Sequence, residues 1–388
     1  MALAKSASHD VIASEQQCAD LIRQIEAADR VALDTEADSL HSYREKLCLL
    51  QISAPAVAGI VDAGPTRDEC KSRADHRTGL PDDFIVDPLS NLDLEPLRRA
   101  LEPREIVLHA ADYDLRMLRR GLNFTATRIF DTVVAARLLG IREFSLGALV
   151  KRFFDVELPK HSQKANWALR PLPPRMLEYA VDDVHYLLAL AATLEDELER
   201  VQRLDWFRQS CARAIESAST ARERTEDEIW RIAGAGALDP QAGAVLRALW
   251  QWRETEAELA DRPPFHILHN RELLESAGNF VSGRVPDYKH FSTRRRQAFR
   301  EAAKIALQSP QSEWPVMRRR AGVRPTPEMR QRADELRDRR DKAAVQLGLE
   351  GSFIASRGAL EAIAADPARA TALLVPWQRE LIGIDQVG

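Results

Sequence analysis

The chain has 388 residues, 45% of them hydrophobic, and a formal net charge of −4. This length predicts two or three domains, each with its own core. The start lacks the apolar region of a signal peptide, no apolar run is long enough to span a membrane, and the four cysteines lack metal-type spacing. We therefore expect a reduced, cytoplasmic protein and exclude membrane and disulfide-rich secreted classes. The net charge does not indicate a nucleic-acid binder, although basic residues cluster locally.

Residues 31–37 (VALDTEA) have the pattern of a strand. Side chains alternate between the two faces of a strand, so Asp34 and Glu36 project from the same face. A strand that ends in a polar turn would give similar letters. Alone, the motif leaves both interpretations open.

Residues 106–110 (IVLHA) predict a second buried strand, followed by a helix that Asp112 would cap. Asp114 then lies in the first helical turn, beside the end of the strand. The alternative is an acid that only favours the helix N-terminus. His109 lies within an apolar strand, so we expect a packed, hydrogen-bonded histidine and not a metal ligand.

The helical stretch MLEYAVDDVHYLLAL carries Tyr179 and Asp183 four residues apart. Residues at this spacing share one helix face, so the phenol and the carboxylate point the same way. Asp182 lies off that face, and His185 is expected to be structural. An amphipathic helix with an incidental tyrosine is the alternative.

Clustered carboxylates repel one another, and their burial is unfavourable. Such a cluster becomes favourable when it binds divalent cations, and Mg²⁺ and Mn²⁺ prefer oxygen ligands. Two such cations can hold a phosphodiester for in-line displacement. The acids therefore predict a two-metal site.

The order DTE, HAxxxDL and YxxxD resembles the DEDD superfamily of 3′–5′ exonucleases. The segments REKLCLLQIS, IFDTVVAARLLG, SLGALVKRFFDVELPK and WALRPL are similar to ribonuclease D. The histidine branch of the superfamily would have His at the position of Glu178. The resemblance is therefore to the tyrosine branch, and it covers nearly the whole chain.

This resemblance implies a ribonuclease-H-like (DnaQ-like) α/β exonuclease domain over residues 1–210, with a mixed five-stranded sheet. The segments expected as strands lie near 31–36, 47–53, 58–62, 105–110 and 129–132. A polar insertion at about 64–87 departs from the family and repeats an IVD motif at Ile85–Asp87. Its composition predicts an exposed loop, with a substrate flap as the alternative.

The resemblance also implies the chemistry. Asp34 would bridge two Mg²⁺ or Mn²⁺ ions, Glu36 and Asp183 would complete the first site, and Asp114 would help to hold the second. Tyr179 would orient the attacking water. The expected activity is removal of 5′-mononucleotides from RNA 3′ ends, with tRNA precursors as substrates and a monomer as the active form. A DNA-directed exonuclease and a non-catalytic RNA-binding scaffold remain alternatives.

Residues 222–308 resemble an HRDC domain, an all-α nucleic-acid-binding module, and residues 309–388 resemble a degenerate second copy. Trp230 and its neighbours are expected to form core. We expect two basic clusters to contact nucleic acid, with a solvated helix face as the alternative. Two residues of the WALRPL segment are further candidates. The full set is Arg294, Arg295, Arg296, Arg318, Arg319, Arg320, Trp167 and Arg170.

Overall fold

The computed structural model of the chain describes residues 11–55, 82–159, 164–220, 225–317 and 325–384. The chain divides into two compact units. The first combines residues 1–37, 46–221 and 325–388, and the second combines residues 38–45 with 222–324. Among the described residues, no helix has the length and hydropathy needed to cross a membrane.

A six-stranded mixed sheet organises the first unit, in the order β1-β4-β3-β2-β5-β6. β2 lies between β3, to which it is antiparallel, and β5, to which it is parallel. β3 is wholly buried and no residue of β2 is fully exposed, as expected for a sheet covered on both faces. The strands are β1 (Val11–Ile12), β2 (Arg30–Ala37), β3 (Leu47–Ala54), β4 (Asp82–Val86), β5 (Glu105–Leu108) and β6 (Arg128–Asp131).

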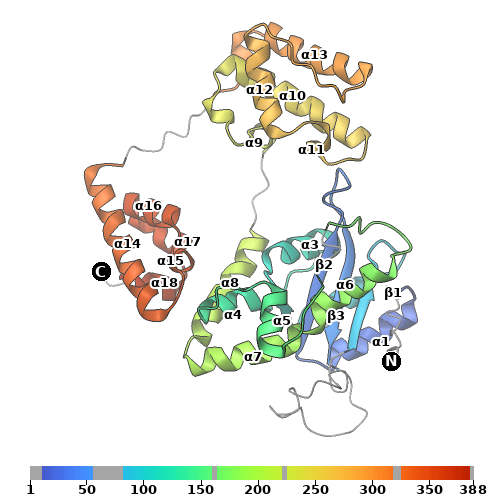
Figure 1. Cartoon of the computed structure of the whole chain (residues 1–388), viewed down its shortest axis with the longest axis vertical. Coiled ribbons are helices and arrows are strands. Elements are labelled where there is room, and N and C mark those ends of the chain that lie inside the picture. Colours follow the sequence, from blue (N-terminus) through green and yellow to red (C-terminus); the bar gives the residue numbers. More distant parts are fainter. Residues whose placement is uncertain (1–10, 56–81, 160–163, 221–224, 318–324, 385–388) are drawn as a thin grey trace. The chain divides into compact units, whose positions relative to one another are not determined.

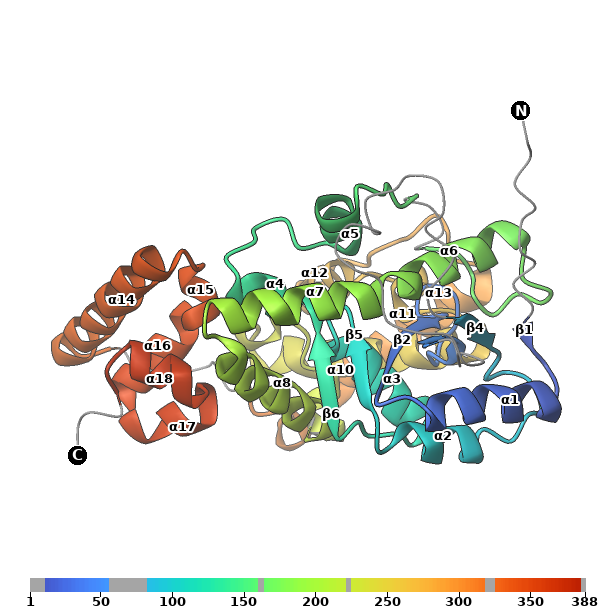
Figure 2. The same ribbon diagram turned by 90° about the horizontal axis from the view of Figure 1, so that it is seen from below.

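Helices cover both faces of this sheet. Figure 2 shows α6 and α7 along one side of the sheet and α1 and α2 along the other. The helices of this part are α1 (Glu15–Glu26), α2 (Glu95–Leu101), α3 (Asp112–Leu122), α4 (Thr132–Leu138), α5 (Leu146–Phe154), α6 (Pro174–His185), α7 (Leu187–Arg200) and α8 (Leu204–Ser219). The predicted boundary at residue 210 falls inside α8, which continues to Ser219.

Among the described residues the sheet has six strands and not the five predicted, and the end of the expected insertion is not a loop. Residues 82–86 form β4, which pairs with both β3 and β1. Asp82 and Asp83 made this segment look like a turn, but Asp83 accepts a hydrogen bond from Ser53 on β3 at 2.7 Å. The short β1 adds the sixth strand at the sheet edge. The expected strand near 58–62 lies outside the described residues.

The second unit is helical (Figure 1). Trp230 is fully buried in its core, so the expectation for the tryptophan is confirmed. Its helices are α9 (Glu226–Ile229), α10 (Pro240–Leu259), α11 (Pro264–Ile267), α12 (Asn270–Val281) and α13 (Thr293–Gln308).

The C-terminal helices belong to the first unit, although they follow the second in sequence. Their order, a long helix, a four-residue helix and a medium helix, repeats the order of α10, α11 and α12. Trp377 stacks on Trp206 of α8, with ring centroids 5.0 Å apart. These helices are α14 (Pro327–Leu347), α15 (Gly351–Ile354), α16 (Arg357–Ala365), α17 (Ala370–Leu373) and α18 (Pro376–Leu381).

Candidate active site

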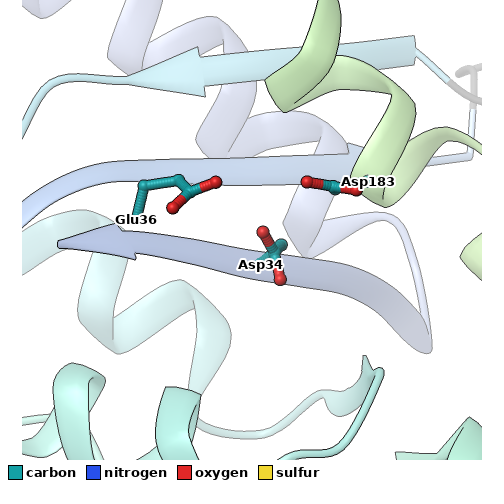
Figure 3. Close-up of side chains that lie close together, drawn as sticks. All are labelled: Asp34, Glu36 and Asp183. Carbon is teal, nitrogen blue, oxygen red and sulfur yellow. The ribbon is translucent and has the colours of Figure 1, made fainter. Parts of the chain in front are cut away.

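Three predicted carboxylates meet between β2 and α6. Asp34, Glu36 and Asp183 each offer a carboxylate oxygen, and these oxygens lie within 4.8 Å of one another. Figure 3 shows Asp34 and Glu36 projecting from the same strand, with Asp183 reaching them from the helix. Strand alternation on β2 and helix periodicity on α6 therefore act as the sequence predicted.

Asp114 approaches the same cluster from α3. Its side chain is buried and accepts a hydrogen bond of 2.6 Å from the Thr35 hydroxyl. Thr35 lies between Asp34 and Glu36 on β2, so the strand that carries two of the acids also fixes the fourth. Asp114 lies in the first helical turn as predicted, but Ala111 and not Asp112 is the N-cap residue.

Asp131 shapes the turn that leads into α3, a role that its local sequence did not indicate. Ala110 in this turn has φ +62°, a left-handed conformation that is uncommon for a residue other than glycine. The Asp131 carboxylate accepts hydrogen bonds from the backbone N–H groups of Ala110 and Ala111, at 3.1 and 2.9 Å. His109 hydrogen-bonds Thr132 at 2.8 Å, and burial lowers its pKa, as expected for a structural histidine.

β4 holds both ends of the segment that carries Tyr179 and Asp183. Before α6, the Arg170 guanidinium donates two hydrogen bonds of 2.6 Å to Asp87, which directly follows β4. At the end of α6, His185 hydrogen-bonds Asp83 of β4. His185 is therefore structural, as predicted. Because α6 is fixed to the sheet at two points, its acidic face is fixed relative to β2.

The electrostatics match a site built for cations. Burial and the neighbouring carboxylates raise the pKa of Asp34 well above its usual value. The same causes raise the pKa of Glu36 to about 9, and burial above all raises those of Asp183 to about 7 and Asp114 to about 6. Among the described residues, no ion pair involves any of these four acids. A set of half-buried or buried oxygen donors that disfavours its own negative charge fits hard divalent cations.

Tyr179 faces the cluster, as its spacing from Asp183 predicted. The phenol is buried and hydrogen-bonds Asp183. Burial, followed by the charge of Asp183, raises its pKa further above the ordinary value. The hydroxyl therefore keeps its proton at neutral pH and can donate a hydrogen bond. Glu178, at the position of the other branch's histidine, is exposed.

The residues expected to contact nucleic acid are mostly engaged within the protein. Trp167 is 1% exposed and packs against Tyr179, so its indole has no face free for a base. Arg170 pairs with Asp87, as described above. Arg294 and Arg295 both bond to Glu256, and Arg296 pairs with Asp287. Arg318, Arg319 and Arg320 lie outside the described residues.

Comparisons with known proteins agree with this geometry. A family model described as 3′–5′ exonuclease matches residues 10–199, and a model of the HRDC domain matches residues 242–278. Ribonuclease D from Pseudomonas paraeruginosa is 30% identical over 384 residues, which cover 95% of this chain and 93% of that protein. The chain belongs to the ribonuclease D family. It is therefore a 3′–5′ exoribonuclease that acts on RNA, and the suspected resemblance is confirmed.

Solved structures confirm the fold of this ribonuclease D family member. The structure of Escherichia coli RNase D, described as an exoribonuclease involved in structured RNA processing, has a TM-score of 0.69 at 20% identity. It covers 97% of this chain and 98% of that one. A protein from Bifidobacterium adolescentis has a TM-score of 0.75 at 23% identity, with coverage of 98% and 96%. Exonucleases of this family use divalent metal ions, which agrees with the acidic cluster.

Proposed function

We propose that the enzyme hydrolyses RNA from the 3′ end with two divalent cations, Mg²⁺ or Mn²⁺, and releases 5′-mononucleotides. The observation that carries this proposal is the approach of three carboxylate oxygens within 4.8 Å, with Asp114 beside them. Asp34 would contribute to both cation sites, Glu36 and Asp183 to one, and Asp114 to the other. When bound, the cations would activate the attacking water and stabilise the leaving 3′ oxygen.

The chain's own residues supply the orientation. The Thr35 hydroxyl holds Asp114, and the ties from β4 hold α6, so the four carboxylates approach along fixed directions. The protonated Tyr179 hydroxyl lies beside Asp183, where it would orient the attacking water by a hydrogen bond. Preorganisation of this kind lowers the barrier because the groups do not have to reorganise during the reaction.

We further propose tRNA precursors with 3′ extensions as substrates and a monomer as the active form. The ribonuclease D relatives support an RNA substrate, and the Escherichia coli RNase D described as processing structured RNA supports one with a structured body. A DNA-directed exonuclease would use the same acids, so substrate choice needs a direct assay. The cytoplasmic location remains a prediction from the sequence.

The test is degradation of matched RNA and DNA oligonucleotides with Mg²⁺, with Mn²⁺ and with a chelator. We expect stepwise shortening of RNA from the 3′ end, full dependence on metal, and no activity on RNA with a blocked 3′ terminus. Equal turnover of DNA would favour the alternative substrate. Undiminished activity with the chelator would contradict the two-metal proposal.

A further inference from the structure

Gln51 of β3 is a buried polar side chain without a hydrogen-bond partner. It has no exposed surface, and neither its Nε2 nor its Oε1 atom bonds to any group among the described residues. A buried amide without partners destabilises a fold, because it loses its bonds to water and gains none. Such a group at this position asks for an explanation.

The pairing register puts Gln51 next to Asp34. The two residues are directly opposite each other on antiparallel β3 and β2. Opposed residues in an antiparallel pair project from the same face, with Cβ atoms about 4.5–5.5 Å apart. The amide of Gln51 is therefore within reach of the Asp34 carboxylate.

The other neighbours on this face define what surrounds Gln51. On its other side it pairs with Ile85 of β4, which belongs to the same apolar cluster as Tyr179. α6 packs over β2, β3 and β4, so the helix that carries Tyr179 and Asp183 covers this face. Gln51 thus lies between the sheet and α6, beside the acidic cluster and shielded from the solvent.

The next polar residue on the same face of β3 behaves differently. Ser53 donates a hydrogen bond to Asp83, and Asp83 in turn bonds to His185. The fold therefore satisfies the polar group two residues away and leaves both atoms of Gln51 unsatisfied. This contrast indicates that packing alone does not explain the glutamine, because an apolar residue would fill the same space.

We infer that Gln51 is a positioning residue of the active site, whose amide holds the Asp34 carboxylate in the orientation that binds metal. The inference rests on the proposed two-metal function. Carboxylates that bind metals are themselves commonly held by hydrogen bonds from a second set of residues. The structure shows no bond between these groups; with metal bound, the amide N–H would donate to Asp34 and the amide oxygen would accept from a water of the site.

The test is calorimetric titration of the full chain with Mn²⁺, without RNA, for the wild type and two variants. Gln51→Met keeps the side-chain length and removes both polar atoms. Leu49→Met is the matched control, because Leu49 lies on the same strand and face, opposite Glu36, and is already apolar. We expect Gln51→Met to weaken Mn²⁺ binding about 10–100-fold, the range for loss of a residue that holds a metal ligand. Leu49→Met should bind as the wild type does.

Two further measurements separate positioning from a structural role. Metal-free Gln51→Met should melt at the same temperature as the wild type or higher, since the Gln51 side chain makes no hydrogen bond with the described residues of the structure. Its cleavage rate should recover as Mn²⁺ is raised. Wild-type Mn²⁺ affinity in Gln51→Met would overturn the inference, and a lower metal-free melting temperature with that affinity would identify a buried water as the partner.

Two safeguards keep the result interpretable. If Gln51→Met does not fold, Gln51→Asn replaces it, because it withdraws the amide from Asp34 by one methylene and should also weaken Mn²⁺ binding. A wild type that binds no Mn²⁺ would contradict the proposed function itself. A wild type that binds Mn²⁺ with the same affinity as both Gln51 variants would contradict only the inference about Gln51.

Discussion

Carboxylates that are buried or half-buried occur in both units, and their surroundings are opposite in kind. Glu256 on α10 is 3% exposed and accepts two hydrogen bonds from Arg294, at 2.8 and 2.7 Å, and one from Arg295 at 3.1 Å. Asp34 and Glu36 lie beside other acids, and none of the ion pairs among the described residues includes them. In the second, helical unit, arginine side chains compensate the buried carboxylate. In the first unit, which carries the exonuclease fold, the acids have no such partner in the part of the chain that the structure describes, and they fit divalent metal ions instead.

This difference distinguishes a carboxylate that stabilises the fold from one that we propose binds metal. Removal of one partner from a paired, buried charge leaves the other partner uncompensated and destabilises the fold. Removal of one acid from a crowded acidic cluster relieves repulsion and removes a metal ligand. The same chemical substitution should therefore have opposite effects on stability in the two units.

The largest effect should follow from Asp34→Asn, with Glu256→Gln as its counterpart. Asp34→Asn should lower turnover by more than about 100-fold, since loss of a metal ligand should cost more than the roughly 10–100-fold typical for loss of a residue that holds one. The stability of the metal-free protein should be unchanged or raised. Glu256→Gln should destabilise its unit by about 1–3 kcal/mol, less than a wholly buried pair, because the Arg294 side chain stays 66% exposed. Single-turnover assays measure the cleavage rate, and melting curves in chelator measure the metal-free stability of both variants. An Asp34→Asn protein that is destabilised but active would contradict the assignment of Asp34 to a metal site.

Tyr179→Phe should reduce the cleavage rate by about 10²–10⁴-fold, because the water-orienting hydroxyl is lost. Mn²⁺ binding should persist, since the four carboxylates remain. Tyr288→Phe in the helical unit is the control: its hydroxyl bonds Ser276 at 2.8 Å, so it should affect stability and not chemistry. A wild-type cleavage rate in Tyr179→Phe would make the phenol structural.

The metal-free enzyme should lose stability as the pH rises. The pKa values of Asp114, Asp183 and Glu36 are raised to about 6, 7 and 9, whereas unfolded carboxyls titrate near pH 4. Between about pH 4 and about pH 9 the folded chain therefore binds more protons than the unfolded chain. The stabilising contribution of these three carboxyl groups is complete below about pH 4 and is lost as the pH rises through about 9.

Melting curves in chelator at about pH 5.5 and about pH 8.5 measure this loss. Added Mg²⁺ should reduce the pH dependence, because cations replace the protons in compensating the carboxylates. Asp34→Asn should show a shallower dependence than the wild type. If the melting temperature depends equally on pH with and without Mg²⁺, the pH effect does not arise from the proposed metal site.

The site was predictable from the sequence where local periodicity determines it. Strand alternation aligned Asp34 with Glu36, and helix spacing aligned Tyr179 with Asp183, before any contact was known. The order of the motifs then gave the family and the α/β fold. Each of the two alignments depends on residues within four positions of one another, whereas the order of the motifs spans the exonuclease segment.

What the sequence did not reveal depends on long-range contacts. Arg170 looked available for nucleic acid, but its partner Asp87 lies 83 residues away in sequence. β4 looked like a loop because of its acids, but Asp83 is satisfied by Ser53 and His185 from other elements. Gln51 carried no signal of its own, since its importance follows from the register that places it opposite Asp34.

The smallest predicted effect concerns the basic clusters and the salt dependence of RNA binding. Truncation at residue 210 is a poor test, because it divides α8 and removes helices that share the core of the exonuclease unit, including Trp377. Point variants are therefore preferable. Arg294, Arg295 and Arg296 already pair with acids, so their replacement by alanine should lower stability more than RNA affinity.

Replacement of Arg318, Arg319 and Arg320 by alanine should act on binding instead, if these residues contact phosphates. Each lost contact lowers the log–log slope of affinity against salt by about 0.7–0.9, so three contacts would lower it by about 2–3. Phosphate contacts carry no base information, so the loss should be the same for RNAs of different sequence. The measurement is the affinity for an RNA with a structured body and a 3′ extension, at several salt concentrations. All proteins carry Asp34→Asn, so that the RNA is not degraded during the measurement. An unchanged slope for residues 318–320 together with a reduced slope for 294–296 would assign the phosphate contacts to α13, and would mean that the ion pairs with Glu256 and Asp287 exchange for RNA on binding.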